Sequence, residues 1–146
     1  MIDAPIVLVE DRPDDVLLTR RAFARAGFDN ELVVLPDGEA CMTALFPENG
    51  GRSLSPALIL LDINLPKIGG LDVLRRIRAD ERTCHLTVVM LTTSTERRDI
   101  VDSYRLGANS FVRKPVSYSE FADTVRILGS YWLAINEPCP PERGRR

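Results

Sequence analysis

Five short apolar runs recur along the chain, and polar segments long enough to hold a helix separate them. The runs are rich in Val, Ile and Leu and span residues 6–9, 32–35, 57–61, 86–91 and 110–112. Alternation of this kind predicts βα units around a parallel sheet. The first, third and fourth runs are apolar throughout, which is typical of central strands covered on both faces. The pattern therefore predicts an α/β domain.

The polar segments carry signals of helix ends. The first helix is expected to begin at Pro13, with Asp14 and Asp15 in its first turn as partners of the helix dipole, and to end at Gly27. Further helices are expected near residues 39–46 and 96–106, and after the glycine pair at positions 69 and 70. The arginines that follow that pair, at positions 75, 76, 78 and 82, predict a solvated basic face.

The last helix has the strongest start signal. Ser117 and Glu120 form a capping-box pattern, and Val116 is expected to pack against Phe121. Helical spacing predicts an inward face formed by Val125, Leu128, Trp132 and Ile135.

The end of this helix carries more apolar surface than one sheet face covers. Tyr131, Trp132 and Leu133 are therefore candidates for a contact between two copies of the chain. The alternative, in which Tyr131 and Trp132 close the bottom of the core, stays open. Residues 3–135 are expected to form the domain, with an extended fifth helix, and the charged, Pro-rich residues 136–146 a disordered tail.

Composition narrows the class of protein. The 146 residues are 45% hydrophobic and 27% charged with a net charge of -2, which predicts one globular domain without an appended DNA-binding or kinase module. The charge favours neither nucleic acid nor a membrane surface as partner, and neither a signal peptide nor a membrane span is expected. Three cysteines without CxxC spacing predict reduced thiols in the cytoplasm.

The residues that follow the predicted strands carry the candidate chemistry. Glu10 and Asp11 follow the first run, Asp62 the third, Thr92 the fourth and Lys114 the fifth. The carboxyl ends of parallel strands meet at one edge of a sheet, so these side chains are expected to converge. Three acids together require a cation, and their oxygens suit Mg²⁺. With a lysine and a threonine hydroxyl beside them, they predict phosphoryl transfer to a carboxylate.

The same residues carry a family resemblance. The acidic pair Glu10–Asp11, the sequence DINLPKIGG from Asp62, MLTTS containing Thr92, and FVRKP containing Lys114 occur in an order and spacing that resemble a response-regulator receiver (CheY-like) domain. The resemblance covers about residues 6–128. It implies a flavodoxin-like (βα)5 fold, a doubly wound five-stranded parallel sheet with strand order 2-1-3-4-5.

The resemblance also implies roles at the site. Asp62 would receive the phosphoryl group, which Thr92 and Lys114 would contact. Glu10, Asp11, Asp62 and the backbone carbonyl of Asn64 would bind Mg²⁺ or Mn²⁺.

Further roles concern switching and the lifetime of the phosphoryl group. Thr92 and Phe111 would be the switch residues, and Asn64 and Ser94 would tune hydrolysis. The peptide bond between Lys114 and Pro115 would be cis.

A subgroup is indicated by VEDRPDD, LDINLPKIGG, LTTS and the prolonged last helix, which resemble the stand-alone regulators of phytochrome-type histidine kinases. The resemblance implies a single-domain regulator of a two-component phosphorelay that forms a homodimer. Its partners would be a cognate histidine kinase, such as a bacteriophytochrome, and a downstream protein or phosphotransfer partner. It would be a switch rather than an enzyme, with only self-catalysed phosphoryl transfer and autodephosphorylation.

Two other classes share parts of this pattern. A haloacid-dehalogenase-like phosphatase also uses a strand-ending Asp, Mg²⁺ and a Lys, but it requires a second Asp two residues after the nucleophile, where this chain has Asn64. A pseudo-receiver would bind a partner without phosphorylation, and the presence of Asp62, Thr92 and Lys114 argues against it.

Overall fold

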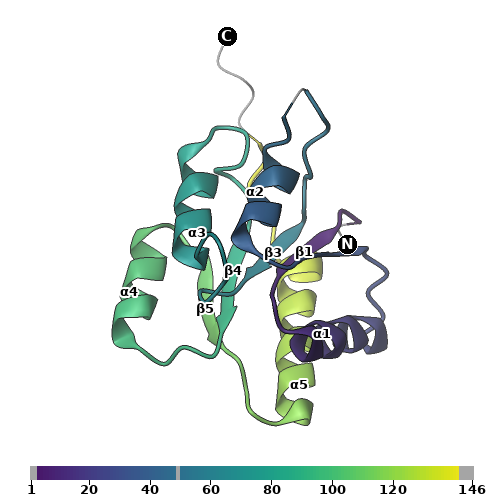
Figure 1. The fold of residues 1–146 in the computed structure, drawn as a ribbon. Helices are drawn as coiled ribbons and strands as arrows, with labels where there is room; N and C mark the ends of the chain where they lie inside the picture. The colour runs from purple at the N-terminus through teal and green to yellow at the C-terminus, as the bar shows by residue number, and fades with distance from the viewer. Residues whose placement is uncertain (1–2, 49, 142–146) are drawn as a thin grey trace.

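A five-stranded parallel sheet forms the centre of the computed structural model, which describes residues 3–48 and 50–141 (Figure 1). The strands are β1 (Ile6–Val9), β2 (Leu32–Leu35), β3 (Leu58–Leu61), β4 (Val88–Thr92) and β5 (Ser110–Arg113). Their order is β2-β1-β3-β4-β5, and all neighbours are parallel. The predicted fold class and strand order are confirmed.

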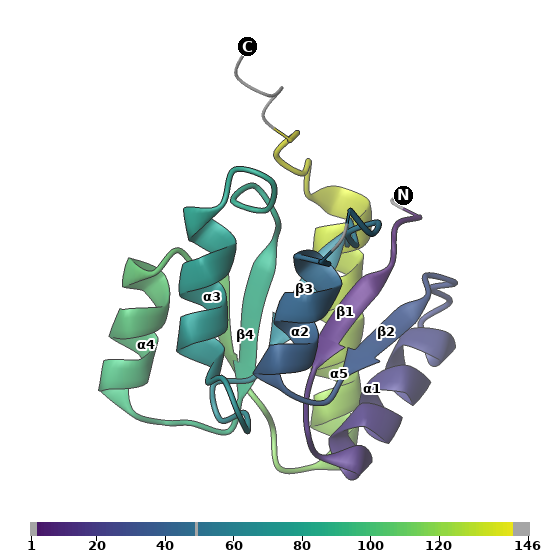
Figure 2. The same ribbon diagram turned by 45° about the horizontal axis from the view of Figure 1, so that its top comes forward.

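Helices cover both faces of the sheet (Figure 2). The helices α1 (Pro13–Arg25) and α5 (Tyr118–Gly129) pack on one face, and α2 (Gly38–Leu45), α3 (Gly70–Ala79) and α4 (Arg97–Arg105) lie on the other. Alternate residues of each central strand enter different cores: Ile6 and Leu8 face α1 and α5, whereas Val7 and Val9 face α2 and α3. This two-sided burial explains why the central strands are apolar throughout.

The start of α5 has the predicted N-cap but not the predicted hydrophobic contact. The hydroxyl of Ser117 accepts a hydrogen bond from the backbone N–H of Glu120 at 3.2 Å, as in an N-cap. The expected packing of Val116 on Phe121 is wrong, because Val116 is fully exposed and Phe121 is buried in the core shared with α1. The loop before α5 thus presents Val116 to solvent.

The prolonged last helix changes its geometry after Gly129. A π-helical segment, η1 (Ser130–Ile135), continues α5, and the Asn136 N–H donates to the Tyr131 carbonyl. A π turn holds more residues than an α turn, so the side chains that follow shift around the helix axis. Leu133 is consequently buried, at 1% exposure, while Ile135 is 68% exposed. The inward position predicted for Ile135 is therefore wrong, and Leu133 is a core residue rather than an accessible dimer contact.

The C-terminal segment after η1 is irregular in its described part, residues 136–141. Residues 142–146 of the expected tail lie outside the described residues. Across residues 3–48 and 50–141, none of the helices combines the length and hydropathy that crossing a bilayer demands.

Candidate functional site

Three strand ends bring opposite charges together at the carboxyl edge of the sheet. The ammonium of Lys114, after β5, donates to Glu10 after β1 and lies 3.2 Å from Asp62 Oδ2 after β3. It also lies 3.0 Å from Oδ2 of Asp15 in the first turn of α1. Glu10, Asp62 and Lys114 are buried. We call Glu10, Asp15, Asp62 and Lys114 the acid–lysine cluster.

Backbone hydrogen bonds beyond the strand ends position this cluster. The N–H of Glu10 donates to Leu35 O at 3.0 Å, that of Asp62 to Val9 O at 3.3 Å, and that of Lys114 to Thr92 O at 2.8 Å. The sheet ladder therefore holds the backbone of each charged residue in place.

Gly70 allows α3 to begin directly beside the backbone of Asp62. A Cβ atom at position 70 would overlap the carbonyl oxygen of Asp62. The Gly70 N–H donates to Ile63 O at 2.9 Å and closes the intervening loop. The glycine pair seen in the sequence is thus a close-packing requirement as well as a turn signal.

Each buried carboxylate uses one oxygen for backbone donors and the other for Lys114. Asp62 Oδ1 accepts from the Asn64 N–H at 3.1 Å. Glu10 Oε2 accepts from the N–H groups of Asp11 and Arg12 at 3.1 and 3.3 Å. This division fixes both carboxylates in orientation and leaves their remaining oxygens facing a single cation.

Burial dominates the electrostatics of Glu10. Desolvation raises its pKa from 4.5 to about 7, although the hydrogen bond and charge of Lys114 act in the opposite direction. Burial also lowers the pKa of Lys114, but its hydrogen bond to Glu10 and the charge of Asp62 outweigh that effect and leave the pKa raised. Lys114 therefore remains charged at neutral pH, while the raised pKa of Glu10 brings its titration close to neutral pH.

The oxygen donors at this edge suit a hard divalent cation in kind. Within the described residues, however, no three acidic, His or Cys side chains form a ready metal-binding group. The ammonium of Lys114 occupies the space between Glu10 and Asp62, and the side chain of Asp11 is exposed at the same edge. A cation bound by these acids would have to share their oxygens with Lys114.

The two predicted switch residues lie beside the cluster and α4. Thr92 is buried, and its hydroxyl accepts from the Ser94 N–H at 3.3 Å. Phe111, on β5, packs partly into the core on the side of α2 and α3. Asn64 is exposed at the loop after β3, and Ser94 is half-buried before α4.

The peptide bond before Pro115 differs from the prediction. None of the peptide bonds in residues 3–48 and 50–141 is cis, so the bond between Lys114 and Pro115 is trans and the prediction is wrong. Trans is the isomer that X–Pro bonds favour in general. Lys114 reaches all three carboxylates with this backbone.

Sequence reasoning missed the contact of Asp15. It was assigned only to the helix dipole, yet its carboxylate binds Lys114. The available signal was positional, because Asp15 lies in the first turn of the helix that directly follows the strand end carrying Glu10. The side chain of Asp99 on α4, which accepts from the Ser94 hydroxyl at 2.5 Å, was also missed and had no comparable signal.

A 2-1-3-4-5 sheet with buried acids, a lysine and a threonine at its carboxyl edge defines a phospho-accepting switch domain. The response regulator receiver domain family matches residues 6–126, and the chain belongs to this family. The predicted family is thereby confirmed, and receiver domains are phospho-accepting switches.

Relatives agree with this assignment over most of their length. The chain is 42% identical to the probable methanogenesis regulatory protein FilR2 of Methanothrix harundinacea, over 93% of this chain and 88% of that protein. It resembles the Mn²⁺-bound structure of response regulator Rcp1, known from Synechocystis, with 34% identity, a TM-score of 0.85, and coverage of 94% of this chain and 99% of that chain. The phosphorylated cyanobacterial phytochrome response regulator RcpA gives 34% identity and a TM-score of 0.86, covering 95% and 100%. The chain is a response regulator homologous to phytochrome response regulators.

Proposed function

We propose that Asp62 accepts a phosphoryl group from a histidine kinase. A carboxylate oxygen of Asp62 attacks phosphorus, and the bond from phosphorus to the donor nitrogen breaks as the histidine leaves. The observation that carries this proposal is the buried Asp62 carboxylate held 3.2 Å from the Lys114 ammonium. Buried next to a fixed positive charge, Asp62 is oriented for in-line attack, and the added phosphoryl oxygens meet a compensating cation.

The neighbouring groups have distinct roles in this proposal. Lys114 and the Thr92 hydroxyl bind the phosphoryl oxygens. Glu10, Asp11, Asp62 and the Asn64 carbonyl oxygen hold a divalent cation, Mg²⁺ or Mn²⁺, which neutralises charge on the transferred group when bound. Support comes from the clustering of carboxylate oxygens around one positive charge and from the Mn²⁺-bound form of Rcp1.

The lifetime of the phosphoryl group depends in this proposal on autodephosphorylation. Asn64 is exposed beside Asp62, where its side chain can order or exclude an attacking water. Ser94 acts less directly, because its hydroxyl is engaged with Asp99. Thr92 and Phe111 are the residues whose positions respond to phosphorylation.

Incubation with acetyl phosphate and Mg²⁺ tests the acceptor. We expect one added phosphoryl group per chain by intact-mass measurement, released by hydroxylamine as an acyl phosphate should be. Asp62→Asn should take up none, while Asp72→Asn, which removes an exposed acid of α3, should behave like the wild type. An adduct that persists in Asp62→Asn would contradict the assignment.

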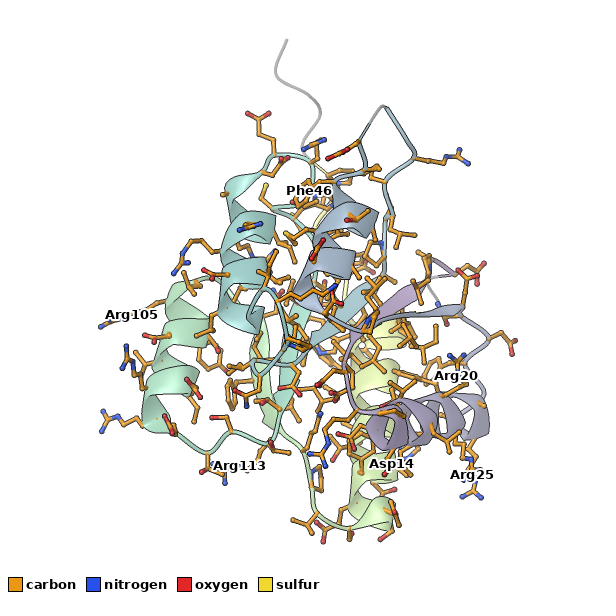
Figure 3. The ribbon with its side chains drawn as sticks, viewed as in Figure 1. Asp14, Arg20, Arg25, Phe46, Arg105 and Arg113 are labelled. Carbon is orange, nitrogen blue, oxygen red and sulfur yellow. The ribbon has the colours of Figure 1, made fainter. Side chains whose placement is uncertain are left out.

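The donor is proposed to be a histidine kinase of the phytochrome type that approaches beside α1. A groove lined by Asp14, Asp15, Lys114, Val116 and Tyr118 leads to the acid–lysine cluster. Val116 and Tyr118 are strongly exposed apolar side chains, as expected of a protein contact. Farther along α1, the side chains of Arg20 and Arg25 also extend outward (Figure 3).

Phosphotransfer from a purified bacteriophytochrome kinase tests this donor. Tyr118→Glu should slow transfer from the kinase but leave phosphorylation by acetyl phosphate unchanged, because the small donor needs no docking surface. Equal transfer rates for wild type and variant would contradict docking on this side.

Homodimerisation is proposed through the outer side of α5 and η1. Ile127, Tyr131 and Ile135 are exposed at four-residue spacing, and Trp132 packs edge-to-face on Tyr131. Sedimentation at tens of micromolar, roughly the range of weak interfaces, should show a dimer that Ile135→Glu weakens. Leu17→Glu, at an exposed apolar position on α1, is the matched control. A monomeric wild type, with and without phosphodonor, would contradict this proposal.

The proposed function also includes a downstream partner and a location in the cell. Residues 3–135 act as the functional unit and signal through a downstream protein or phosphotransfer partner. A cytoplasmic location is supported by Cys41, Cys84 and Cys139, which are free thiols.

A further inference from the structure

Helix α4 is hydrogen-bonded at both ends to the segments that carry the expected switch residues. At its first turn, Asp99 Oδ2 accepts from the Ser94 hydroxyl at 2.5 Å. The same serine donates its backbone N–H to the Thr92 hydroxyl at 3.3 Å. A two-bond chain therefore joins α4 to Thr92.

Ser94 is held from a second side as well. Its hydroxyl accepts from the Glu96 N–H at 3.3 Å, while Glu96 O accepts from the Asp99 N–H at 3.1 Å. The loop between β4 and α4 is thus closed on itself around the Ser94 hydroxyl. A displacement of Thr92 or Ser94 would be transmitted to the first turn of the helix.

At the other end of α4, the hydroxyl of Tyr104 reaches β5. It accepts from the backbone N–H of Phe111 at 3.2 Å. The strand β5 is an edge of the sheet, bounded by β4 on one side only. Tyr104 is half exposed, and the bond of its hydroxyl to the Phe111 N–H joins α4 to this strand.

We propose that Asp99 and Tyr104 are positioning residues that hold Thr92 and Phe111 in the unphosphorylated arrangement. The inference rests on the proposed function, in which these two residues respond to a phosphoryl group on Asp62. The Thr92 hydroxyl accepts from the Ser94 N–H, so a movement of Thr92 toward that group alters this bond. The bonds of Asp99 and Tyr104 oppose this change, and α4 couples them through one rigid element.

A bond formed in one of two arrangements biases their equilibrium by its net free energy. Loss of a hydrogen bond to a charged group should shift it about tenfold, and loss of a neutral one about fivefold. We call the hydrogen bonds Ser94–Asp99 and Phe111–Tyr104 the two clamps. Weakening either clamp should favour the phosphorylated arrangement. Phosphorylation should then be faster, and the phosphoryl group should persist longer.

The test measures the rate of phosphorylation by acetyl phosphate with Mg²⁺, and the decay rate after donor removal. Asp99→Ala and Ser94→Ala should each raise the phosphorylation rate about tenfold, and Tyr104→Phe about fivefold. The double variant of Asp99 and Ser94 should resemble Ser94→Ala, because Ser94→Ala already removes the bond to Asp99 and also the bond from the Glu96 N–H. Asp99→Asn, which keeps an acceptor oxygen, should lie closer to the wild type.

A matched control separates the clamps from general effects on α4. Asp102→Ala removes an acid of the same helix that forms a salt bridge with Arg98, at 3.7 Å. This variant should retain wild-type rates.

The outcomes distinguish the proposed clamps from the proposed phosphorylation of Asp62. If the wild type is phosphorylated and the folded clamp variants match its rates, or react more slowly, the clamps are refuted and the acceptor stands. If the wild type takes no phosphoryl group, the proposed function fails and the clamps fail with it. Circular dichroism confirms that each variant is folded, and Tyr104→Phe offers an isosteric change where Asp99→Ala alters the helix start.

Discussion

Two cationic side chains lie at opposite ends of the sheet, and their hydrogen-bond acceptors differ in charge. The ammonium of Lys114, at the carboxyl edge, pairs with the carboxylates of Glu10, Asp15 and Asp62. Arg78, on α3 near the amino ends of β4 and β5, meets neutral acceptors instead. Its Nε donates to Gly107 O at 2.8 Å, and its other nitrogens donate to Cys84 O at 3.0 Å, Leu86 O at 2.6 Å and Asn109 Oδ1 at 2.8 Å.

The difference separates a structural cation from one that serves chemistry. The guanidinium of Arg78 matches four acceptors in fixed directions, which no spherical ion reproduces. The ammonium of Lys114 is a compact charge among negative oxygens, and another cation can share that place. Burial lowers the pKa of Arg78, whereas the carboxylates raise that of Lys114. The acceptors around Arg78 require donors in fixed directions, whereas the carboxylates around Lys114 require a positive charge.

The largest effect is expected from Arg78→Met. Three backbone carbonyls and Asn109 would lose a donor, and we expect a loss of about 3 kcal/mol in the free energy of unfolding. Urea denaturation measures it. Arg76→Met, at an exposed position on the same helix, should be close to neutral. A loss below about 1 kcal/mol for Arg78→Met would show that water replaces the guanidinium at little cost.

The next effect is expected from Lys114→Met. The loss should be about 2 kcal/mol without divalent ions, less than for a typical broken buried pair because Glu10 can take up a proton. Millimolar Mg²⁺ should restore part of this stability, since a second cation can face the same carboxylates. The same Mg²⁺ should not restore Arg78→Met. If Mg²⁺ restored the stability of both variants equally, the two ends of the sheet would not differ in their need for charge.

Sequence reasoning succeeded where a residue's role follows from its place at a strand end. Glu10, Asp62, Thr92 and Lys114 could be assembled because parallel strands all end at one edge. The strand order came with the family resemblance carried by those residues. Neither step required knowledge of how any helix is rotated.

It failed where the orientation of a helix decides. Arg78 was assigned to a solvated face, but the turns before β4 and β5 present carbonyls to it, which only tertiary packing reveals. Ile135 was predicted to face inward and Leu133 to be an accessible contact. Leu133 is the buried residue instead, because the π-helical segment changes the helical period. Local sequence carries no simple signal for either event.

A smaller effect concerns pH. The folded-state pKa of Glu10 is about 7 against 4.5 in an unfolded chain, so between these values the folded protein holds a proton that the unfolded chain releases. Stability without divalent ions should therefore fall as pH rises from about 5 to 7, by roughly 1 kcal/mol. Thermal unfolding in EDTA measures this, and Glu10→Gln should remove the slope. Stability that rises over this range in the wild type alone would contradict the assignment.

The smallest effects should come from exchanging neutral and charged acceptors at the two ends. Asp15→Asn keeps an oxygen near Lys114 but removes a charge that is partly exposed, and should cost about 0.5 kcal/mol. Asn109→Asp does the reverse beside Arg78 and should stabilise by a similar, small amount that salt screens, because Asn109 is exposed. Urea midpoints at low and high salt measure both. The Val88 N–H also donates to the Asn109 side chain. If Asn109→Asp destabilised the protein strongly, this backbone hydrogen bond would matter more for stability at that end of the sheet than the bond to Arg78.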